Sequence, residues 1–379
     1  MNISKLEQPI YVTRPLMPSY DLYTEKLKDI WSSKWLSNQG PQHIELEDKL
    51  KAYLDVDHLS LFNNGTTALT VAIQALRLQG EVITTPFSFP ATTHALTWNG
   101  ITPVFCDIDP HTMTIDPTKI EGLITSKTSA ILGVHVYGIP CHVEEIERIA
   151  DRHGLKVIYD GAHSFGAMID DKPIGSFGDI TMFSFHPTKL FHTSEGGALV
   201  CADENLKQRI DLLKNFGIKN ETEVIMPGIN GKMNEMSALM GLCVLDIVDG
   251  ERDRRAQLRQ LYLEGLANIP GVSVVAVQDN VINSQQYMVI RINEDEFGQS
   301  RDQTYDNLKS YNILARKYFF PLISDYPCYN QLPTAAADRL ENSTVISNQV
   351  LCLPFYGELK DSDIEVICQV IKSKRSCYE

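Results

Sequence analysis

The sequence predicts an α/β protein with a largely parallel sheet, followed by a smaller α+β region. Short runs rich in Val and Ile are separated by polar stretches that fit helices: EVITT (81–85), TPVFCDI (102–108), AILGVHV (130–136) and LKVIYD (155–160). Short apolar strands that alternate with helices are typical of a parallel sheet covered on both faces. At 379 residues the chain is long enough for one large domain and one smaller one.

The same pattern continues to about residue 202 and then changes. ITMFSF (180–185) and GALVCA (197–202) predict two more strands, one of which could run antiparallel. Residues 234–271 predict one or two long helices that end at Pro270 and Gly271. Beyond them, segments follow in the order β-β-α-β, namely VSVVAV, QYMVIRI, RDQTYDNLKSYN and ILARKYFFPL. We therefore expect a large domain over residues 1–250 and a small C-terminal domain over residues 251–379.

The composition bounds what the protein can bind. Hydrophobic residues make up 43% of the chain and charged residues 22%, which suits a globular protein with a sizeable core. The formal charge of −14 argues against nucleic-acid binding, because phosphate backbones need clustered Lys and Arg. No run of 18 apolar residues and no signal-peptide segment is present, so we expect a cytosolic protein. The eight cysteines are scattered without a C-x-x-C pair, which indicates neither a zinc site nor a disulfide framework.

Lys189 and Asp160 form the most informative pair of residues. Asp160 ends the apolar run LKVIYD, and Lys189 follows the strand ITMFSF in the stretch SFHPTKLFHTSEGG. This arrangement suits pyridoxal phosphate (PLP), because a lysine amine condenses with its aldehyde and a carboxylate keeps its pyridine nitrogen protonated. Taken alone, Asp160 has a plainer explanation, since an Asp after a strand often caps a helix.

A candidate phosphate site lies earlier in the chain. SLFNNGTTALTVAIQAL (60–76) predicts a strand end, an Asn-Gly turn and a helix that opens at Thr66. Free backbone N–H groups and the hydroxyls of Thr66 and Thr67 would make this helix N-terminus an anion site, although an ordinary capped helix is an equal alternative. Ser184, five residues before Lys189, is a second hydroxyl that could reach the same phosphate.

Two further side chains could contact the cofactor ring. Phe89 follows a strand and a proline, where a loop at the carboxyl edge of the sheet would lie, and its ring could stack on the pyridine. A place in the core is the commoner fate of such a residue, and Phe87 competes for the role. His163, three residues after Asp160, could contact the ring hydroxyl O3′, although a lone histidine more often serves packing.

These motifs together make the chain resemble the DegT/DnrJ family of sugar-nucleotide aminotransferases, which have the fold of aspartate aminotransferase (fold type I). The resemblance runs nearly end to end and includes YDGAHSFGA (159–167), FSFHPTKLFHTSEGGALV (183–200), LKNFGI (213–218) and PGINGKMNEMSALMGL (227–242). It implies a large domain with a mostly parallel seven-stranded sheet flanked by helices, and a smaller C-terminal α+β domain.

The resemblance also implies a role for each residue at the ring. Lys189 would bind PLP and, once released, would carry the proton between the amine carbon and C4′ of the cofactor. That task requires a neutral amine near pH 7, so the pKa of Lys189 should be lowered. Asp160 would pair with the pyridine nitrogen, and His163 would lie beside O3′ at a position that is often Gln. Phe89 would stack on the ring.

At the other end of the cofactor, the resemblance implies that Thr66, Thr67 and Ser184 hold the phosphate and that Gly65 allows close backbone approach. Asn230 matches an Asn that reaches the phosphate in the neighbouring subunit, so the active site would be completed across a two-fold dimer. Many relatives carry Arg at the position of Lys232 and Arg-Asn at Lys214–Asn215. These changes could affect how the nucleotide diphosphate is held, because Lys is a point charge where Arg is a fork.

The implied reaction has two halves, in which L-glutamate gives its amino group to the cofactor and a nucleotide-linked keto-sugar then receives it. LKNFGI followed by PGINGKMNE resembles enzymes that aminate C4 of dTDP-4-keto-6-deoxyglucose more than those that aminate C3. The product, dTDP-4-amino-4,6-dideoxyglucose, would serve bacterial surface polysaccharide such as O-antigen or glycosylated metabolites.

Three alternatives differ in chemistry. A PLP-dependent sugar dehydratase would carry His at position 189, where this chain has Lys. A regulatory relative without turnover would be expected to lose part of the set Asp160, Ser184 and Lys189. An aminotransferase for free amino acids would need an Arg that grips a carboxylate, for which Arg316 is the candidate.

Overall fold

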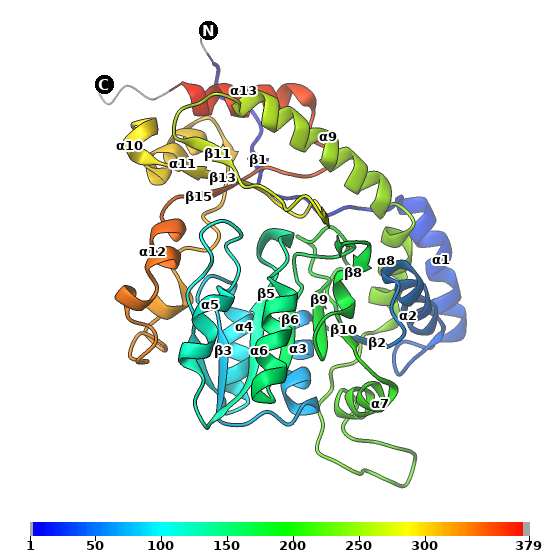
Figure 1. Cartoon of the computed structure of the whole chain (residues 1–379). Coiled ribbons are helices and arrows are strands. Elements are labelled where there is room, and N and C mark those ends of the chain that lie inside the picture. The colour runs from blue at the N-terminus through cyan, green and yellow to red at the C-terminus, as the bar shows by residue number, and fades with distance from the viewer. Residues whose placement is uncertain (1–2, 374–379) are drawn as a thin grey trace.

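The computed structural model describes residues 3–373, which form a large α/β body and a smaller unit above it in Figure 1. The central sheet has seven strands in the order β2-β10-β9-β6-β5-β3-β4. Their bounds are β2 (Leu59–Phe62), β3 (Glu81–Thr84), β4 (Thr102–Phe105), β5 (Thr128–Val134), β6 (Lys156–Asp160), β9 (Ile180–Ser184) and β10 (Gly197–Cys201). Strand β10 runs antiparallel to both of its neighbours and the other pairs are parallel, so the predicted sheet is confirmed.

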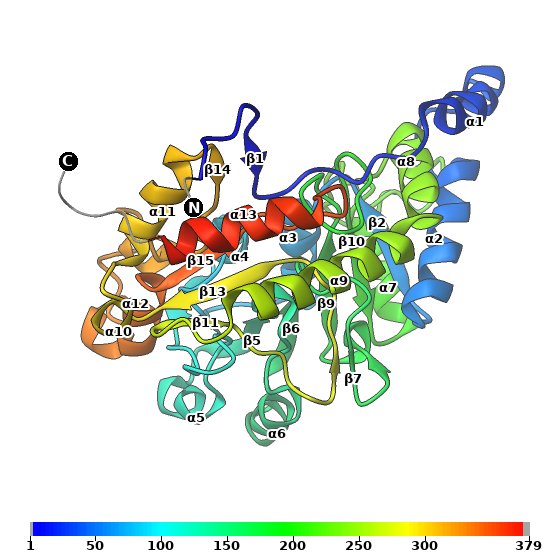
Figure 2. The same cartoon turned by 90° about the horizontal axis from the view of Figure 1, so that it is seen from above.

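Helices cover both faces of this sheet because its strands are apolar on both sides. In β5, Leu132 packs with the helices α3 (Gly65–Ala75) and α4 (Pro90–Trp98), whereas its neighbour Ile131 packs with α6 (Val143–His153). Figure 2, seen from above, shows α3 and α4 on one side of the sheet and α6 on the other. The remaining helices of the body are α2 (Pro41–Leu54), α5 (Pro117–Ile120), α7 (Glu204–Leu213) and α8 (Glu235–Leu245).

The C-terminal unit is built on a three-stranded antiparallel sheet of β11 (Val272–Val274), β13 (Met288–Ile292) and β15 (Val350–Leu353). Its main helices are α9 (Val248–Leu266), α11 (Arg301–Ser310) and α13 (Asp361–Lys372). The stretch 234–271 is thus two helices, α8 and α9. We propose that α9 begins the small domain, since the expected boundary near residue 250 falls in its first turn.

The prediction of a strand over ILARKYFFPL (313–322) is wrong beyond the first two residues. Only β14 (Ile313–Leu314) is a strand, and it pairs with β1 (Ile10–Tyr11) rather than with the small sheet. The backbone of Arg316 makes one bridge to Cys352, after which the chain turns towards the large body and places aromatic side chains there. The α-helices and strands that remain are α1 (Tyr20–Ser33) and the short elements β7 (Met168–Ile169), β8 (Lys172–Pro173), β12 (Val281–Ile282), α10 (Glu294–Phe297) and α12 (Glu341–Ser347).

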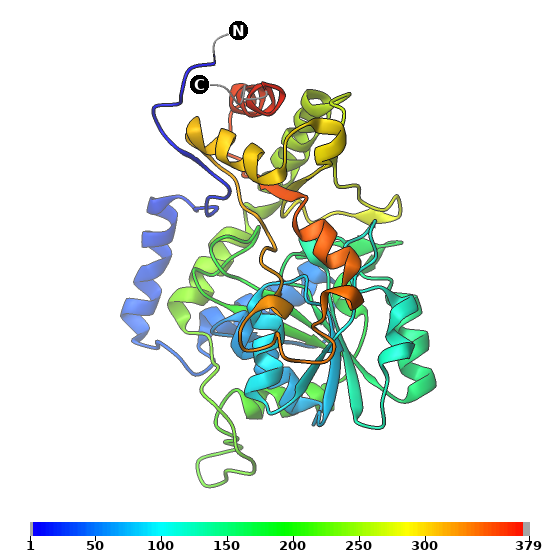
Figure 3. The same cartoon turned by 90° about the vertical axis from the view of Figure 1, so that its left-hand side faces the viewer.

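Two features project from the body: the helix α1, which packs against α8 through Ile30, and the middle of the loop of residues 214–232 that follows α7 (Figures 1 and 3). Both expose large apolar side chains, among them Tyr20, Trp31, Phe216, Val224 and Ile225. Within residues 3–373, no helix is both long and apolar enough to cross a membrane. Seven of the cysteines are described, all as free thiols, and Cys377 lies outside the described residues.

Candidate active site

A cavity of about 220 Å³ opens at the carboxyl ends of the parallel strands β5, β6 and β9. This edge of an open α/β sheet is where ligands bind in folds of this kind. Three aromatic residues from the C-terminal unit, Tyr287, Tyr318 and Phe319, close the cavity from above. The cavity therefore lies where the two parts of the chain meet.

Lys189 reaches this cavity from the loop after β9, where its backbone N–H donates to His186 O at 2.9 Å. Burial lowers the pKa of Lys189 to about 8, and the charge of Asp160 acts in the opposite direction. The Nζ atom lies 5.8 Å from the centre of the Tyr287 ring. An amine with this pKa is partly neutral near pH 7, which is the form that can attack an aldehyde.

Asp160, the last residue of β6, also lines the cavity and is 4% exposed. Its Oδ2 accepts a hydrogen bond of 2.7 Å from Thr92 Oγ1, and its Oδ1 accepts one of 3.1 Å from the Ala162 N–H. Burial raises the pKa of Asp160, although these hydrogen bonds and the charge of Lys189 oppose the rise. A carboxylate held in this way still has lone pairs for a cation, and the protonated nitrogen of a PLP ring fits that need.

His163 is held as a neutral imidazole. Its Nδ1 accepts a 3.2 Å hydrogen bond from the Tyr137 N–H, and burial together with the charge of Lys189 keeps its pKa well below the usual value. The proton of the neutral ring must therefore be on Nε2. The ring of Phe319 stacks on His163 with centroids 5.8 Å apart and planes at 9°. His163 can thus donate one hydrogen bond into the cavity, as the ring hydroxyl of PLP requires.

The N-terminus of α3 supplies an anion site at one end of the cavity. Gly65, Thr66 and Ser184 line the cavity, as does Asn64, whose Oδ1 caps the helix by accepting the Thr67 N–H at 2.7 Å. The helix begins one residue earlier than expected because of this cap. A Cβ added at Gly65 would lie 3.1 Å from Ser184 Cβ, so a side chain there would crowd the site. A cradle that needs glycine at its base is what the phosphate of PLP requires.

Solvent exposure distinguishes Phe89 from Phe87, the two candidates for stacking on the cofactor ring. Phe89 is 58% exposed and lines the cavity, so one ring face is available to a flat ligand. Phe87 is fully buried and packs edge-on against Tyr137 and Phe319. The structure thus places Phe89 at the site and Phe87 in the core.

Four other residues singled out in the sequence do not line this cavity in their own chain. Thr67 does not line it, and its methyl group faces the position of Gly231. Asn230 is exposed on the 214–232 loop, where it forms a bridge with Asn215. Lys232 lies beside them and donates to Asn215 Oδ1 at 2.8 Å. Arg316 is exposed and also lies away from the cavity.

Sequence reasoning missed several residues of the site. Asn64 could have been recognised, because an Asn directly before a helix is a common cap. Thr92, Tyr137 and Phe319 gave no such signal, since each contacts Asp160 or His163 from an element far away in sequence.

Fold and site together fit a PLP-dependent enzyme of fold type I, because a lysine, a buried carboxylate and a helix N-terminus with free hydroxyls line one cavity. The sequence profile of the DegT/DnrJ/EryC1/StrS aminotransferase family matches residues 21–372, so the chain belongs to this family. It is therefore a sugar aminotransferase with PLP as cofactor.

Individual relatives agree with this assignment. The chain is 46% identical to the dTDP-4-amino-4,6-dideoxy-D-glucose transaminase of Escherichia coli, over 97% of this chain and 99% of the relative. It is 36% identical to the dTDP-3-amino-3,6-dideoxy-alpha-D-galactopyranose transaminase of Aneurinibacillus thermoaerophilus, over 88% of this chain and 90% of the relative. The crystal structure of DesI in the presence of its TDP-sugar product superposes with a TM-score of 0.93 at 37% identity, covering 97% of this chain and 93% of DesI.

Proposed function

We propose that the protein transfers the amino group of L-glutamate to C4 of dTDP-4-keto-6-deoxyglucose, which gives dTDP-4-amino-4,6-dideoxyglucose and 2-oxoglutarate. The observation that carries this proposal is the 46% identity to the E. coli C4 transaminase over nearly the whole of both chains. Amination at C3 of a dTDP-3-keto-6-deoxyhexose is the second candidate, because the C3 relative is 36% identical.

The residues at the ring have distinct tasks in this proposal. When bound, PLP supplies an aldehyde that receives the amino group and a ring that withdraws electrons from the reacting carbon. Lys189 binds that aldehyde and, once the amino substrate frees it, moves the proton at the reacting carbon; its pKa of about 8 suits a base at neutral pH. Asp160 accepts a hydrogen bond from the protonated ring nitrogen and stabilises its positive charge. His163 donates from Nε2 to O3′.

The remaining residues bind and enclose the cofactor. Phe89 covers one face of the ring and excludes water from it. Thr66 and Ser184 hold the phosphate with the first turn of α3, and Gly65 gives the backbone room to approach, whereas Thr67 lies outside the cavity and supports that turn from behind.

A homodimer would complete the site. Asn230 lies on a loop that projects from the body and exposes Phe216, Val224 and Ile225, which a second subunit could cover. In that arrangement Asn230 reaches the phosphate in the partner subunit. We place the enzyme in the cytoplasm, where it would supply amino sugar for O-antigen or other lipopolysaccharide.

The test is to incubate the purified protein, L-glutamate and a panel of nucleotide keto-sugars, and to locate the new amine by NMR. We expect an amine at C4 of the dTDP-4-keto-6-deoxyglucose product and one 2-oxoglutarate per product. An amine at C3 would favour the second candidate. Consumption of keto-sugar without equivalent loss of glutamate would indicate a dehydratase, and failure to bind PLP would indicate a non-catalytic relative.

A further inference from the structure

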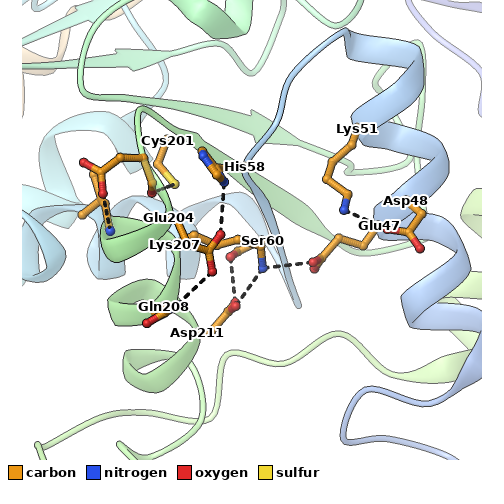
Figure 4. Close-up of polar contacts among 12 residues, drawn as sticks. Glu47, Asp48, Lys51, His58, Ser60, Cys201, Glu204, Lys207, Gln208 and Asp211 are labelled. Atoms are coloured by element: carbon orange, nitrogen blue, oxygen red, sulfur yellow. Dashed lines mark hydrogen bonds and ion pairs between the residues drawn. The ribbon is translucent and has the colours of Figure 1, made fainter.

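A partly buried ionic cluster joins α2, β2 and α7 (Figure 4). None of its members lines the active-site cavity. Asp211 lies at its centre. Asp211 Oδ1 accepts a hydrogen bond of 2.7 Å from Ser60 Oγ, and its two oxygens lie 2.7 Å from the Nζ atoms of Lys207 and Lys214. Lys207 Nζ also contacts Glu47 Oε1 at 3.0 Å. Two cations therefore balance two carboxylates.

Lys214 is the most deeply buried of the charged members. Its side chain is 1% exposed, and Nζ lies 5.6 Å from the centre of the Phe62 ring at the end of β2. A lysine charge is costly to bury, and the attraction to Asp211 offsets that cost only where the geometry is fixed. The position of Lys214 is therefore set by its anchor and not by solvent.

The backbone of Lys214 connects this anchor to the phosphate cradle. Its carbonyl accepts a 2.9 Å hydrogen bond from the Gly231 N–H, and the Gly231 carbonyl accepts one of 2.8 Å from the Asn63 N–H. Asn63 begins the turn that contains Gly65. A Cβ added at Gly231 would lie 3.1 Å from Thr67 Cγ2 and 3.4 Å from Lys214 Cβ, so Gly231 fits closely between α7 and α3.

We propose that Lys214 is a positioning residue for the cofactor phosphate: anchored by Asp211, it fixes Gly231 and, through it, both the turn at residues 63–65 and Asn230. This proposal rests on the proposed function, in which the turn at residues 63–65 and Asn230 bind the cofactor phosphate. Lys189 follows β9 and Asp160 ends β6. Neither strand contributes a residue to the ionic cluster. A disturbance at Lys214 should therefore affect binding of the phosphate and not reaction at the aldehyde.

The test compares the affinity for PLP with the affinity for pyridoxal, which has the same ring and aldehyde but no phosphate. Lys214→Met keeps most of the side-chain stem and removes the charge. We expect its affinity for PLP to fall roughly tenfold, the equivalent of one hydrogen bond to a charged group. Its affinity for pyridoxal should equal that of the wild type. Both are measured by titrating cofactor-free protein and following the absorbance of the lysine-bound cofactor.

Matched variants make the result specific. Lys207→Met removes the other cation of the cluster. Within residues 3–373 the backbone of Lys207 makes no hydrogen bond to Gly231, so this variant should leave the ratio of the two affinities unchanged. Lys214→Arg restores the charge and should restore PLP affinity. If Lys214→Met does not fold, Gly231→Ala disturbs the same contact from the other side and should show the same selective loss.

Equal losses for PLP and pyridoxal in the folded variant, or no loss for either, would overturn the proposal, as would the same change of ratio in Lys207→Met. If the wild-type protein itself forms no lysine-bound cofactor with PLP, the proposed function fails instead, so the two failures are distinguishable.

Discussion

The hydrogen bond from Thr92 to Asp160 offers a sharp test of how the carboxylate is kept ionised. Thr92 Oγ1 donates to Asp160 Oδ2 at 2.7 Å, and Ser88 Oγ lies 2.7 Å from the same hydroxyl. Thr92→Val replaces that hydroxyl by a methyl group of nearly the same size. Asp160 then keeps the Ala162 N–H and loses its one side-chain donor among the described residues.

The size of the effect follows from the charge of the acceptor. A hydrogen bond to an ionised group contributes about 1.5–3 kcal/mol, and one pKa unit corresponds to about 1.4 kcal/mol. The pKa of Asp160, which burial already raises, should therefore rise further when this hydrogen bond is lost. Because the ionised carboxylate is the active form, activity is lost as the pH falls through this pKa. The acid limb of the pH profile should move to higher pH by about one unit or more.

Thr93→Val is the matched control. Thr93 is buried on the same helix, and its hydroxyl has no hydrogen-bond partner within residues 3–373. The assay is the pH dependence of kcat/KM for the half-reaction with glutamate, followed by cofactor absorbance. We expect a shifted acid limb in Thr92→Val and a wild-type profile in Thr93→Val. An unshifted limb in Thr92→Val, or equal shifts in both variants, would refute the reasoning.

The other predictions concern the residues that contact PLP in the proposed mechanism. Lys189→Ala should abolish the absorbance of lysine-bound cofactor and all transamination while the oligomeric state, measured by light scattering, stays unchanged; retained turnover would remove Lys189 from its role. Asp160→Asn should still bind cofactor but slow both half-reactions about 100-fold or more, because an unprotonated ring withdraws electrons poorly; single-turnover rates equal to those of the wild type would contradict this. Gly65→Ala should weaken PLP binding about tenfold by titration, since its new Cβ would lie 3.1 Å from Ser184 Cβ and move the cradle; unchanged affinity would show that the backbone does not approach the phosphate there.

The large domain could be predicted because its signals are local. Each strand of the parallel sheet is a short apolar run, and each boundary is marked by a turn or a cap, so β5 and β6 fall within two residues of their predicted bounds. The strand predicted over residues 313–322 was wrong beyond Leu314, because the apolar residues that follow do not pack as a strand. Phe319 is buried against His163 at the cavity, a contact made between residues 156 positions apart that periodicity cannot reveal.

The residues of the candidate site also differ in how far the sequence could predict them. Lys189 and Asp160 could be recognised because a lysine after one strand and a carboxylate at the end of another together suit PLP chemistry, and the structure brings both to one cavity. The residues that hold the site's side chains in place could not be recognised from the sequence. Thr92 donates to Asp160 and Tyr137 donates to His163, and these hydrogen bonds exist only after folding. Asn230 shows a different limit: its predicted contact lies on another copy of the chain, and one subunit places it on an exposed loop.

The pKa shifts of Lys189 and Asp160 have the same cause and opposite uses. Desolvation favours the neutral form of both groups, so it frees the Lys189 amine for reaction and at the same time disfavours the charge that Asp160 must carry. In the proposed mechanism Asp160 would pair with the protonated ring nitrogen of PLP, which would supply a second cation beside Lys189. Cofactor binding and ring protonation would then be coupled through one buried carboxylate, and the hydrogen bond from Thr92 favours the ionised form of that carboxylate.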